Sequence, residues 1–258
     1  MKLGLVTYNL AAEWDLDTLI AKCVQHRFEG VELRTGHAHG VEVSLAPPAR
    51  AEVKRRFADS PVALVGLGSA FEYHSSDPEE VRRNVEGTKE YVKLAVDLGC
   101  TGVKVRPNGL QVKAGIPKQQ TLAQIGLAFR ECAAFAHDYG VAVRMEVHGP
   151  GTSEPANLRV IVQAADHPNA LVCWNCNPSE VQAGSIRESF DLLSPWIGLV
   201  HLRDLYPQAY PTRELLGLLR GAGYDGYCLA EIAGSPEPDR LMGYYRAVWD
   251  AYLELEGC

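Results

Sequence analysis

Short apolar runs recur along the chain, and a longer stretch with helical spacing follows each of them. The apolar runs occupy residues 3–7, 30–34, 62–68, 102–106, 141–149, 171–175, 197–202 and 227–232. The stretches with helical spacing occupy residues 17–25, 48–58, 78–98, 121–139, 155–165, 185–193, 212–220 and 238–254. Nearly continuous apolar strands that alternate with helices indicate a parallel sheet covered by helices. Eight such units predict an α/β fold with one domain, a (β/α)8 TIM barrel over residues 1–258.

Local signals mark several helix starts and argue against another parallel architecture. Asp77 followed by Pro78 is a typical start, and Thr121 and Ser185 each open a sequence with capping-box spacing. The alternative is a doubly wound sheet, which usually carries a Gly-rich phosphate loop after its first strand. Here that turn is Thr7-Tyr-Asn-Leu-Ala-Ala12, which lacks such a pattern. A closed barrel is therefore favoured.

Composition and charge narrow the class of protein. The chain is 47% hydrophobic and 22% charged, which is enough for a full core. Its net charge of −7 argues against nucleic acid as a partner, and no apolar run approaches the roughly 18–20 residues of a membrane span. Seven scattered cysteines favour a reduced, cytoplasmic setting, with Cys173 and Cys176 as buried thiols. The oligomeric state, including a homo-oligomer, stays open.

The fifth apolar run, 141–149, carries charged residues at alternate positions. Strand residues two apart point the same way, so Arg144, Glu146 and His148 share one face. The intervening valines and Met145 make the other face buried. Charges on a strand buried on both sides are costly unless they have a function.

Polar residues also gather at the ends of the other strands. In a barrel the active site lies at the C-terminal ends of the strands, so these residues are expected to converge there. The candidates are Glu32, Arg34, Glu72, Lys104, Arg106, Asn108, Glu146, His148, Asn175, Asn177, His201, Arg203 and Glu231.

Four of these candidates form a plausible metal site: Glu146, Asn175, His201 and Glu231. Two carboxylates, an imidazole and an amide oxygen suit Mn²⁺ or Mg²⁺ and leave positions open for substrate oxygens, and Zn²⁺ is also compatible. The alternative is that both glutamates pair with neighbouring arginines or lysine and hold no metal.

Several motifs resemble the xylose isomerase-like barrel superfamily. They are Glu146 at the end of strand five, His201-Leu-Arg-Asp204, Glu231 and the strand-two phrase Gly30-Val-Glu-Leu-Arg34. The superfamily includes ketose epimerases, inosose dehydratases and isomerases, and endonuclease IV-type nucleases. The resemblance implies that Glu146 and Glu231 are metal ligands that also handle protons, and that His201 is a ligand.

The sixth strand departs from the family pattern. The family usually shows Trp-Asp-x-x-His there, whereas this chain has Trp174-Asn175-Cys176-Asn177-Pro178. Asn175 removes one negative charge, so we expect weaker metal binding or none. Pro178 cannot be a zinc ligand, which together with the acidic net charge disfavours a nuclease.

The resemblance implies an enzyme that removes a proton next to a carbonyl and forms an enediolate. With Glu146 and Glu231 on opposite sides, this gives a sugar isomerase or epimerase; with a leaving group on the next carbon it gives a dehydratase or lyase. His148 would be the acid for a departing hydroxyl or, alternatively, would hydrogen bond to Glu146. Asn175 also motivates a non-catalytic sugar-binding or partner subunit as an alternative.

The cationic candidates suggest how a small sugar or sugar derivative would be held. Arg106 and Arg203, near the rim, could grip a carboxylate, a phosphate or several hydroxyls. Lys104 and Arg144, one step deeper, are expected to pair internally with carboxylates. The histidines of the loop Gly36-His-Ala-His-Gly40 either contact substrate or are exposed loop residues. The proposed substrate contacts are Glu32, Arg34, His37, His39, Glu72, Arg106, Asn108, Asn177 and Arg203.

Overall fold

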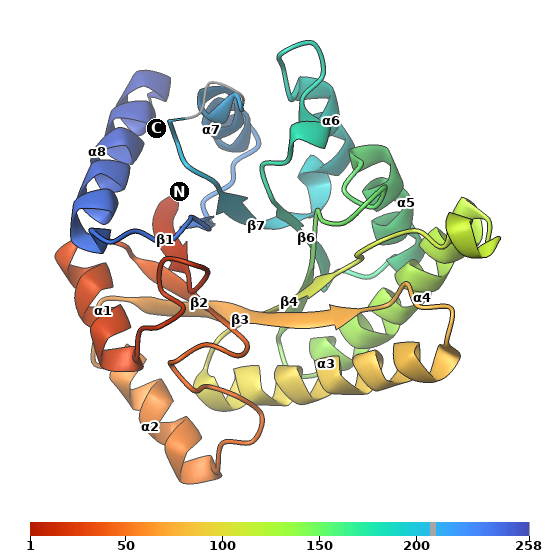
Figure 1. Cartoon of the computed structure of the whole chain (residues 1–258), viewed down its shortest axis with the longest axis horizontal. Coiled ribbons are helices and arrows are strands. Elements are labelled where there is room, and N and C mark those ends of the chain that lie inside the picture. Colours follow the sequence, from red (N-terminus) through yellow and green to blue (C-terminus); the bar gives the residue numbers. More distant parts are fainter. Residues whose placement is uncertain (207–209, 258) are drawn as a thin grey trace.

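The computed structural model describes residues 1–206 and 210–257, and these residues form a closed barrel of parallel strands in sequential order (Figure 1). The strands are β1 (Lys2–Val6), β2 (Gly30–Arg34), β3 (Ala63–Glu72), β4 (Gly102–Arg106), β5 (Ala142–Glu146), β6 (Ala170–Trp174), β7 (Ile197–Leu202) and β8 (Tyr227–Ala230). The helices are α1 (Leu16–Gln25), α2 (Pro47–Ala58), α3 (Pro78–Leu98), α4 (Lys118–His137), α5 (Pro155–Ala165), α6 (Arg187–Leu193), α7 (Thr212–Gly221) and α8 (Pro238–Glu256). The predicted (β/α)8 barrel is confirmed.

The ring of helices surrounds the strands and closes where the two ends of the chain meet. Helices α1 and α8 lie side by side in Figure 1. Lys22 of α1 pairs with Asp239 of α8 at 2.8 Å, and Arg27 pairs with Asp250 at the same distance. Strand β1 pairs with both β2 and β8, so the sheet has no free edge among the described residues.

Glycines inside the barrel make room for charged side chains. A Cβ on Gly102 of β4 would lie 2.3 Å from Arg144 Cζ, and one on Gly68 of β3 would lie 2.8 Å from Glu32 Oε1. Real Cβ atoms essentially never approach other heavy atoms below 3.0 Å, so a side chain at either position would force the arginine or the glutamate to move. These two glycines therefore permit a barrel interior that holds an arginine and a glutamate.

Two predicted helix starts were wrong and one is confirmed. Asp77 caps α3 by accepting a hydrogen bond from Glu79 N at 2.9 Å, and Pro78 is its first residue. Thr121 N already donates to Pro117 O, so Thr121 lies in the first turn of α4 and cannot cap it. Helix α6 begins only at Arg187, with Ile186 at the capping position, and Ser185 Oγ accepts a hydrogen bond from Arg187 N at 3.1 Å from one residue earlier.

The strand ends also differ from the prediction, in a way that affects the site. Strand β3 extends four residues beyond Gly68, because Glu72 still pairs with Arg106 of β4 after a register shift. Strands β5 and β8 end at Glu146 and Ala230. His148 and Glu231 therefore lie just beyond the strands, in the loops that surround the mouth of the barrel.

Two features expected from composition are seen in the structure. The described cysteines are all buried and free, and they include Cys173 and Cys176. Cys258 lies outside the described residues. Among the described helices, none combines the length and the apolar character that a membrane crossing would require.

Candidate active site

A pocket of about 110 Å³ opens at the C-terminal ends of the barrel strands. Its walls are Tyr8, Arg34, Lys104, Arg106, Glu146, His148, Asn175, Arg203 and Glu231. These residues come from or directly follow β1, β2, β4, β5, β6, β7 and β8, so parallel strands far apart in sequence deliver them to one end of the barrel. Eight of the nine were expected from the sequence to lie at this end. Tyr8 was missed, because an uncharged residue after the first strand gave no signal.

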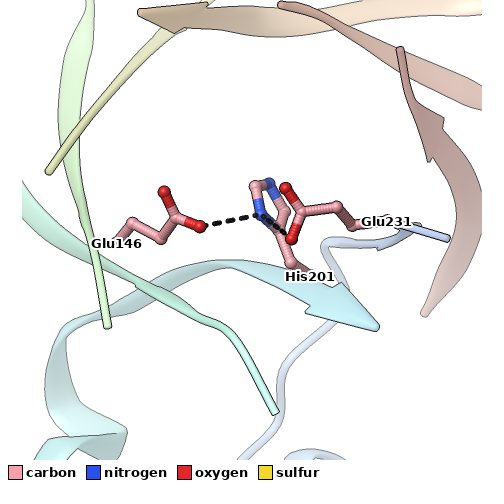
Figure 2. A group of neighbouring side chains, drawn as sticks. All are labelled: Glu146, His201 and Glu231. Carbon is pink, nitrogen blue, oxygen red and sulfur yellow. Dashed lines mark ion pairs between the residues drawn. The ribbon is translucent and has the colours of Figure 1, made fainter. Parts of the chain in front are cut away.

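His201 is fully buried and does not line the pocket, but two glutamates of the pocket wall approach it from opposite sides (Figure 2). His201 Nδ1 lies 3.9 Å from Glu146 Oε1 and 3.9 Å from Glu231 Oε2. One ligand atom from each of the three residues lies within 4.8 Å of the other two. This is a spacing at which one metal ion could contact all three.

Asn175 offers a fourth ligand to the same pocket. It is buried, and its Oδ1 atom has no hydrogen-bond partner among the described residues. A buried carbonyl oxygen without a partner is costly, and a hard cation would satisfy it. The donor set of Glu146, Asn175, His201 and Glu231 therefore fits a divalent cation.

Lys104 forms a buried ion pair with the second carboxylate oxygen of Glu146. Its Nζ atom donates to Glu146 Oε2 at 2.7 Å, and both side chains are only 3% exposed. Burial alone raises the pKa of Glu146, but the Lys104 ammonium and His201 outweigh it and lower that pKa to about 2. The expected internal pairing of Lys104 is confirmed, and it leaves Glu146 Oε1 on the side of His201.

Glu32 lies on the far side of His201, where it is fully buried and does not line the pocket. Its Oε1 atom is 3.4 Å from His201 Nε2. Burial alone lowers the pKa of His201, but Cys173 and Glu32 beside it raise that pKa well above its ordinary value. The surrounding groups thus favour positive charge here, which is also what a divalent cation would supply.

Arg144 does not pair with a carboxylate, so this expectation was wrong. Its Nη1 atom donates to Val65 O at 3.2 Å, and no carboxylate oxygen of the described chain lies within 4.0 Å of it. The side chain passes Gly102 of the neighbouring β4 and reaches Gly66 of β3. The alternation of side chains along β5 correctly predicted that Arg144 lies inside the barrel. The direction of its side chain depends on the space that these glycines leave.

A hydrogen-bonded chain fixes the orientation of His148. Asn108 Nδ2 donates to Glu72 Oε1 at 2.5 Å, which turns Asn108 Oδ1 toward His148 Nδ1 at 2.6 Å. A carbonyl oxygen only accepts, so Nδ1 carries the proton and Nε2 of the neutral ring does not. Burial lowers the pKa of His148, and Arg106 adds to this against the opposing effect of Glu146. His148 is thus a neutral ring whose structural partner is Asn108, not Glu146.

A second network lies behind the pocket wall formed by the loop after β6. Arg203 Nη2 donates to Asn177 Oδ1 at 3.1 Å, and Asn177 Nδ2 donates to Val147 O and to Glu180 Oε1. Tyr210 OH donates to Glu180 Oε2 at 2.6 Å. Burial raises the pKa of Glu180 to about 7 against these hydrogen bonds. Glu180 was missed because its partners are recognisable only once the loops after β6 and β7 meet.

The predicted substrate contacts of the loop after β2 are only partly in the pocket. His39 is buried; its Nε2 donates to Arg34 O at 2.8 Å, and its Nδ1 accepts from Val41 N at 3.0 Å. His37 Nδ1 lies 3.3 Å from Thr7 Oγ1. Neither histidine lines the pocket, whereas Arg34 does. Glu72, Asn108 and Asn177 likewise stand behind the wall, where they hold Arg106, His148 and Arg203.

Comparison with known proteins gives one family match and several structural matches. The family model described as "Xylose isomerase-like TIM barrel" matches residues 20–247. None of the curated proteins compared matches the sequence significantly.

Three solved structures illustrate the structural likeness. D-psicose 3-epimerase from Clostridium cellulolyticum H10 is 16% identical, with a TM-score of 0.80 and coverage of 100% of both chains. The IOLI protein with a bound zinc atom is 17% identical, with a TM-score of 0.79 and coverage of 99% of this chain and 98% of that one. A probable 3-DHS dehydratase from Bacillus anthracis is 16% identical, with a TM-score of 0.76 and coverage of 96% and 99%. At these identities the likeness shows the shared fold.

Proposed function

The chain belongs to the xylose isomerase-like TIM barrel family, and from this premise we propose that it is a sugar isomerase or epimerase. The observation that carries the proposal is the approach of Glu146 and Glu231 to His201 from opposite sides of the pocket. Two carboxylates so placed can remove a proton from one face of a carbon next to a carbonyl and return one elsewhere. The solved structures with this fold include epimerases of small sugars.

The second part of the proposal is a divalent cation held by Glu146, Asn175, His201 and Glu231. Oxygen-rich donor sets of this kind suit Mn²⁺ or Mg²⁺, and a single imidazole is also compatible with Zn²⁺. When bound, such an ion would polarise the substrate carbonyl. Asn175 supplies an uncharged oxygen where a carboxylate would bind more strongly, so the proposed affinity is modest.

The two glutamates differ in how the protein holds them. Glu146 is fixed by the hydrogen bond from Lys104, whereas no described side chain donates a hydrogen bond to the Glu231 carboxylate. Glu231 is also the more open of the two, with 13% of its side chain exposed. We therefore assign proton abstraction to Glu231, whose carboxyl then carries the proton that it can return to the neighbouring carbon. Glu146, which Lys104 and His201 keep ionised, would hold the cation.

The state of His148 favours isomerisation or epimerisation over elimination. Elimination of a hydroxyl needs a proton donor, but the lowered pKa of His148 keeps its ring neutral near pH 7. The hydrogen bond to Asn108 occupies the one ring proton, which leaves Nε2 as an acceptor. His148 thus would accept a hydrogen bond from a substrate hydroxyl and help to orient it. A dehydratase would require a different acid.

The buried free cysteines support a reducing location. All six described cysteines, including the Cys173–Cys176 pair, are buried thiols without a disulfide partner in the described chain. Burial raises the pKa of Cys23 and of Cys228 to about 12, which keeps these thiols protonated and unreactive. We propose that the protein works in the cytoplasm.

The decisive test is solvent deuterium exchange at the substrate carbon. Purified protein loaded with Mn²⁺ is incubated with keto-sugars in D₂O, and exchange is followed by NMR. Glu231→Gln should lower the exchange rate by about 100-fold or more, because general-base catalysis contributes about 10²–10⁴-fold. Glu188→Gln, an exposed glutamate on α6, is the matched control and should exchange like the wild type.

Two outcomes would contradict the proposal. Exchange retained by Glu231→Gln would remove this residue as the base. Saturable sugar binding without exchange by the wild type would favour a binding subunit. Elemental analysis tests the metal independently: we expect one divalent ion per chain, and full activity of metal-free protein would refute the metal part.

A further inference from the structure

The pocket carries more positive than negative charge. Its walls include four side chains that are cationic at neutral pH and two carboxylates, Glu146 and Glu231. The four cations are Arg34, Lys104, Arg106 and Arg203. A bound divalent cation would add to this excess. A substrate that enters the pocket therefore meets a positive environment.

Two of the four cations are neutralised by the protein itself. Lys104 Nζ lies 2.7 Å from Glu146 Oε2, and Arg106 Nη2 lies 2.7 Å from Glu72 Oε1. In each pair the charge that the cation could offer to a ligand is already balanced by a carboxylate at hydrogen-bond distance. The charges of Lys104 and Arg106 are therefore already balanced, and neither residue needs an anionic ligand.

The other two cations have only neutral partners. The guanidinium of Arg34 lies over the ring of Tyr8, with 4.9 Å from Cζ to the ring centroid. Arg203 donates from Nε to Cys176 O at 3.2 Å and from Nη2 to Asn177 Oδ1 at 3.1 Å. Across residues 1–206 and 210–257, no carboxylate oxygen lies within 4.0 Å of either guanidinium.

These neutral partners hold both arginines in place rather than neutralise them. Asn177 is itself buried and anchored by hydrogen bonds to Val147 O and Glu180, so Arg203 rests on a fixed support. Stacking on Tyr8 restricts the guanidinium plane of Arg34 in the same way. An arginine that is held by neutral groups keeps its charge and its remaining N–H donors available for a ligand.

We propose that Arg34 and Arg203 together bind an anionic group of the substrate, a carboxylate or a phosphate, so that the sugar is a keto-sugar acid or a sugar phosphate. The planar, forked donors of arginine match both groups. This inference rests on the proposed function, because it assigns the substrate class of the same pocket.

The position of the two arginines around the barrel is consistent with catalysis at the central glutamates. Arg203 follows β7, Glu231 follows β8, Tyr8 follows β1 and Arg34 ends β2, and these strands are consecutive neighbours in the barrel. The anion would therefore lie on the Glu231 side of the pocket. The rest of the substrate would extend toward Glu146 on β5.

The size of the pocket restricts the substrate further. Its volume is about 110 Å³, whereas pockets for drug-sized ligands span roughly 300–1,000 Å³. A ligand that fills so small a space touches several walls at once, so both arginines can contact the same ligand. A single small sugar fits this description better than an oligosaccharide does.

Three probes with the same carbon skeleton test the proposal: D-fructose, D-fructuronate and D-fructose 6-phosphate. They differ only at the sixth carbon, which bears a hydroxyl, a carboxylate or a phosphate. Binding to Mn²⁺-loaded protein is measured by titration calorimetry. We expect at least one anionic probe to bind about tenfold or more tightly than D-fructose, because hydrogen bonds to charged groups are the stronger ones. The preferred anion distinguishes a sugar acid from a sugar phosphate.

Substitutions then locate the anion. Arg34→Gln and Arg203→Gln should each weaken binding of the preferred anionic probe by about tenfold and weaken D-fructose binding less. Arg159→Gln, an exposed arginine on α5, is the matched control and should bind all three probes like the wild type. Circular dichroism of each variant verifies that it is folded.

Equal affinity of the wild type for all three probes would overturn the proposal. So would an anion preference that survives both substitutions, or one that is lost in Arg106→Gln but kept in the Arg34 and Arg203 variants. Calorimetry needs no turnover, so these results are separable from the proposed function. Anion preference without deuterium exchange would refute the isomerase and leave the anion site standing.

Discussion

The floor and the rim of the pocket hold their charges in opposite ways. On the floor, formed by Glu32, Lys104, Glu146 and His201, every charged group lies beside one of opposite sign. On the rim, Arg106 pairs with Glu72, whereas Arg34 and Arg203 have neutral partners only.

Solvent access explains this difference. The floor residues are almost completely buried, so an unpaired charge there would carry the full free-energy cost of desolvation. Arg203 is exposed and Arg34 is only partly buried, so water can solvate their charges until a ligand arrives. Charge pairing on the floor is thus a requirement of the fold, whereas unpaired charge on the rim is available for binding.

The largest expected effect comes from removing the buried Lys104–Glu146 ion pair of the pocket floor. Lys104→Met leaves the buried Glu146 carboxylate without its partner, and we expect the free energy of unfolding to fall by about 3–5 kcal/mol. Urea denaturation followed by circular dichroism measures this. Lys113→Met, at an exposed lysine, should stay within about 0.5 kcal/mol of the wild type. A loss below about 1 kcal/mol for Lys104→Met would mean that the floor pair behaves like a surface pair.

The next effect concerns Glu180, which supports the rim through Asn177. Burial raises the pKa of Glu180 from its ordinary 4.5 to about 7 in the folded protein. Folding therefore favours the protonated carboxyl, and its contribution to stability is full below pH 4.5 and is lost as the pH rises through about 7.

Glu180→Gln tests this, because glutamine keeps its hydrogens at every pH. Relative to the wild type, the stability of the variant should rise by up to about 3 kcal/mol from pH 4.5 to above pH 7. Thermal or urea unfolding at both ends of this range measures the difference, with Glu188→Gln as the exposed control. A difference between variant and wild type that does not change with pH would show that Glu180 titrates normally.

The smallest expected effect comes from a substitution that adds a negative charge beside the pocket floor. Asn175→Asp introduces a third carboxylate into the donor set, so we expect Mn²⁺ to bind about tenfold more tightly, or about 1.4 kcal/mol. Calorimetric titration with MnCl₂ measures the affinity. Asn9→Asp makes the same change at an exposed position outside the pocket and should leave the affinity unchanged. Unchanged binding by Asn175→Asp would remove Asn175 from the set of metal ligands.

Much of the site could be predicted from the sequence, because strand ends are visible as polar residues that follow apolar runs. Glu146, His201 and Glu231 were expected to meet, and their ligand atoms lie within 4.8 Å of one another. The supporting network of Glu180 and Tyr210 was not foreseen. Its members occupy two different loops, and only the packing of those loops brings Tyr210 OH within 2.6 Å of Glu180.

The sequence by itself determined the barrel and the set of polar groups at its mouth, because apolar runs of strand length and helical spacing are local properties of the chain. Only the tertiary structure decided which charges neutralise one another. Glu72 reaches Arg106 because β3 runs four residues longer than its apolar pattern indicates. No carboxylate oxygen of the described residues lies within 4.0 Å of Arg203. Such pairings depend on strand register and on the reach of side chains across the barrel, and neither quantity is encoded in the local pattern of hydrophobic and polar residues.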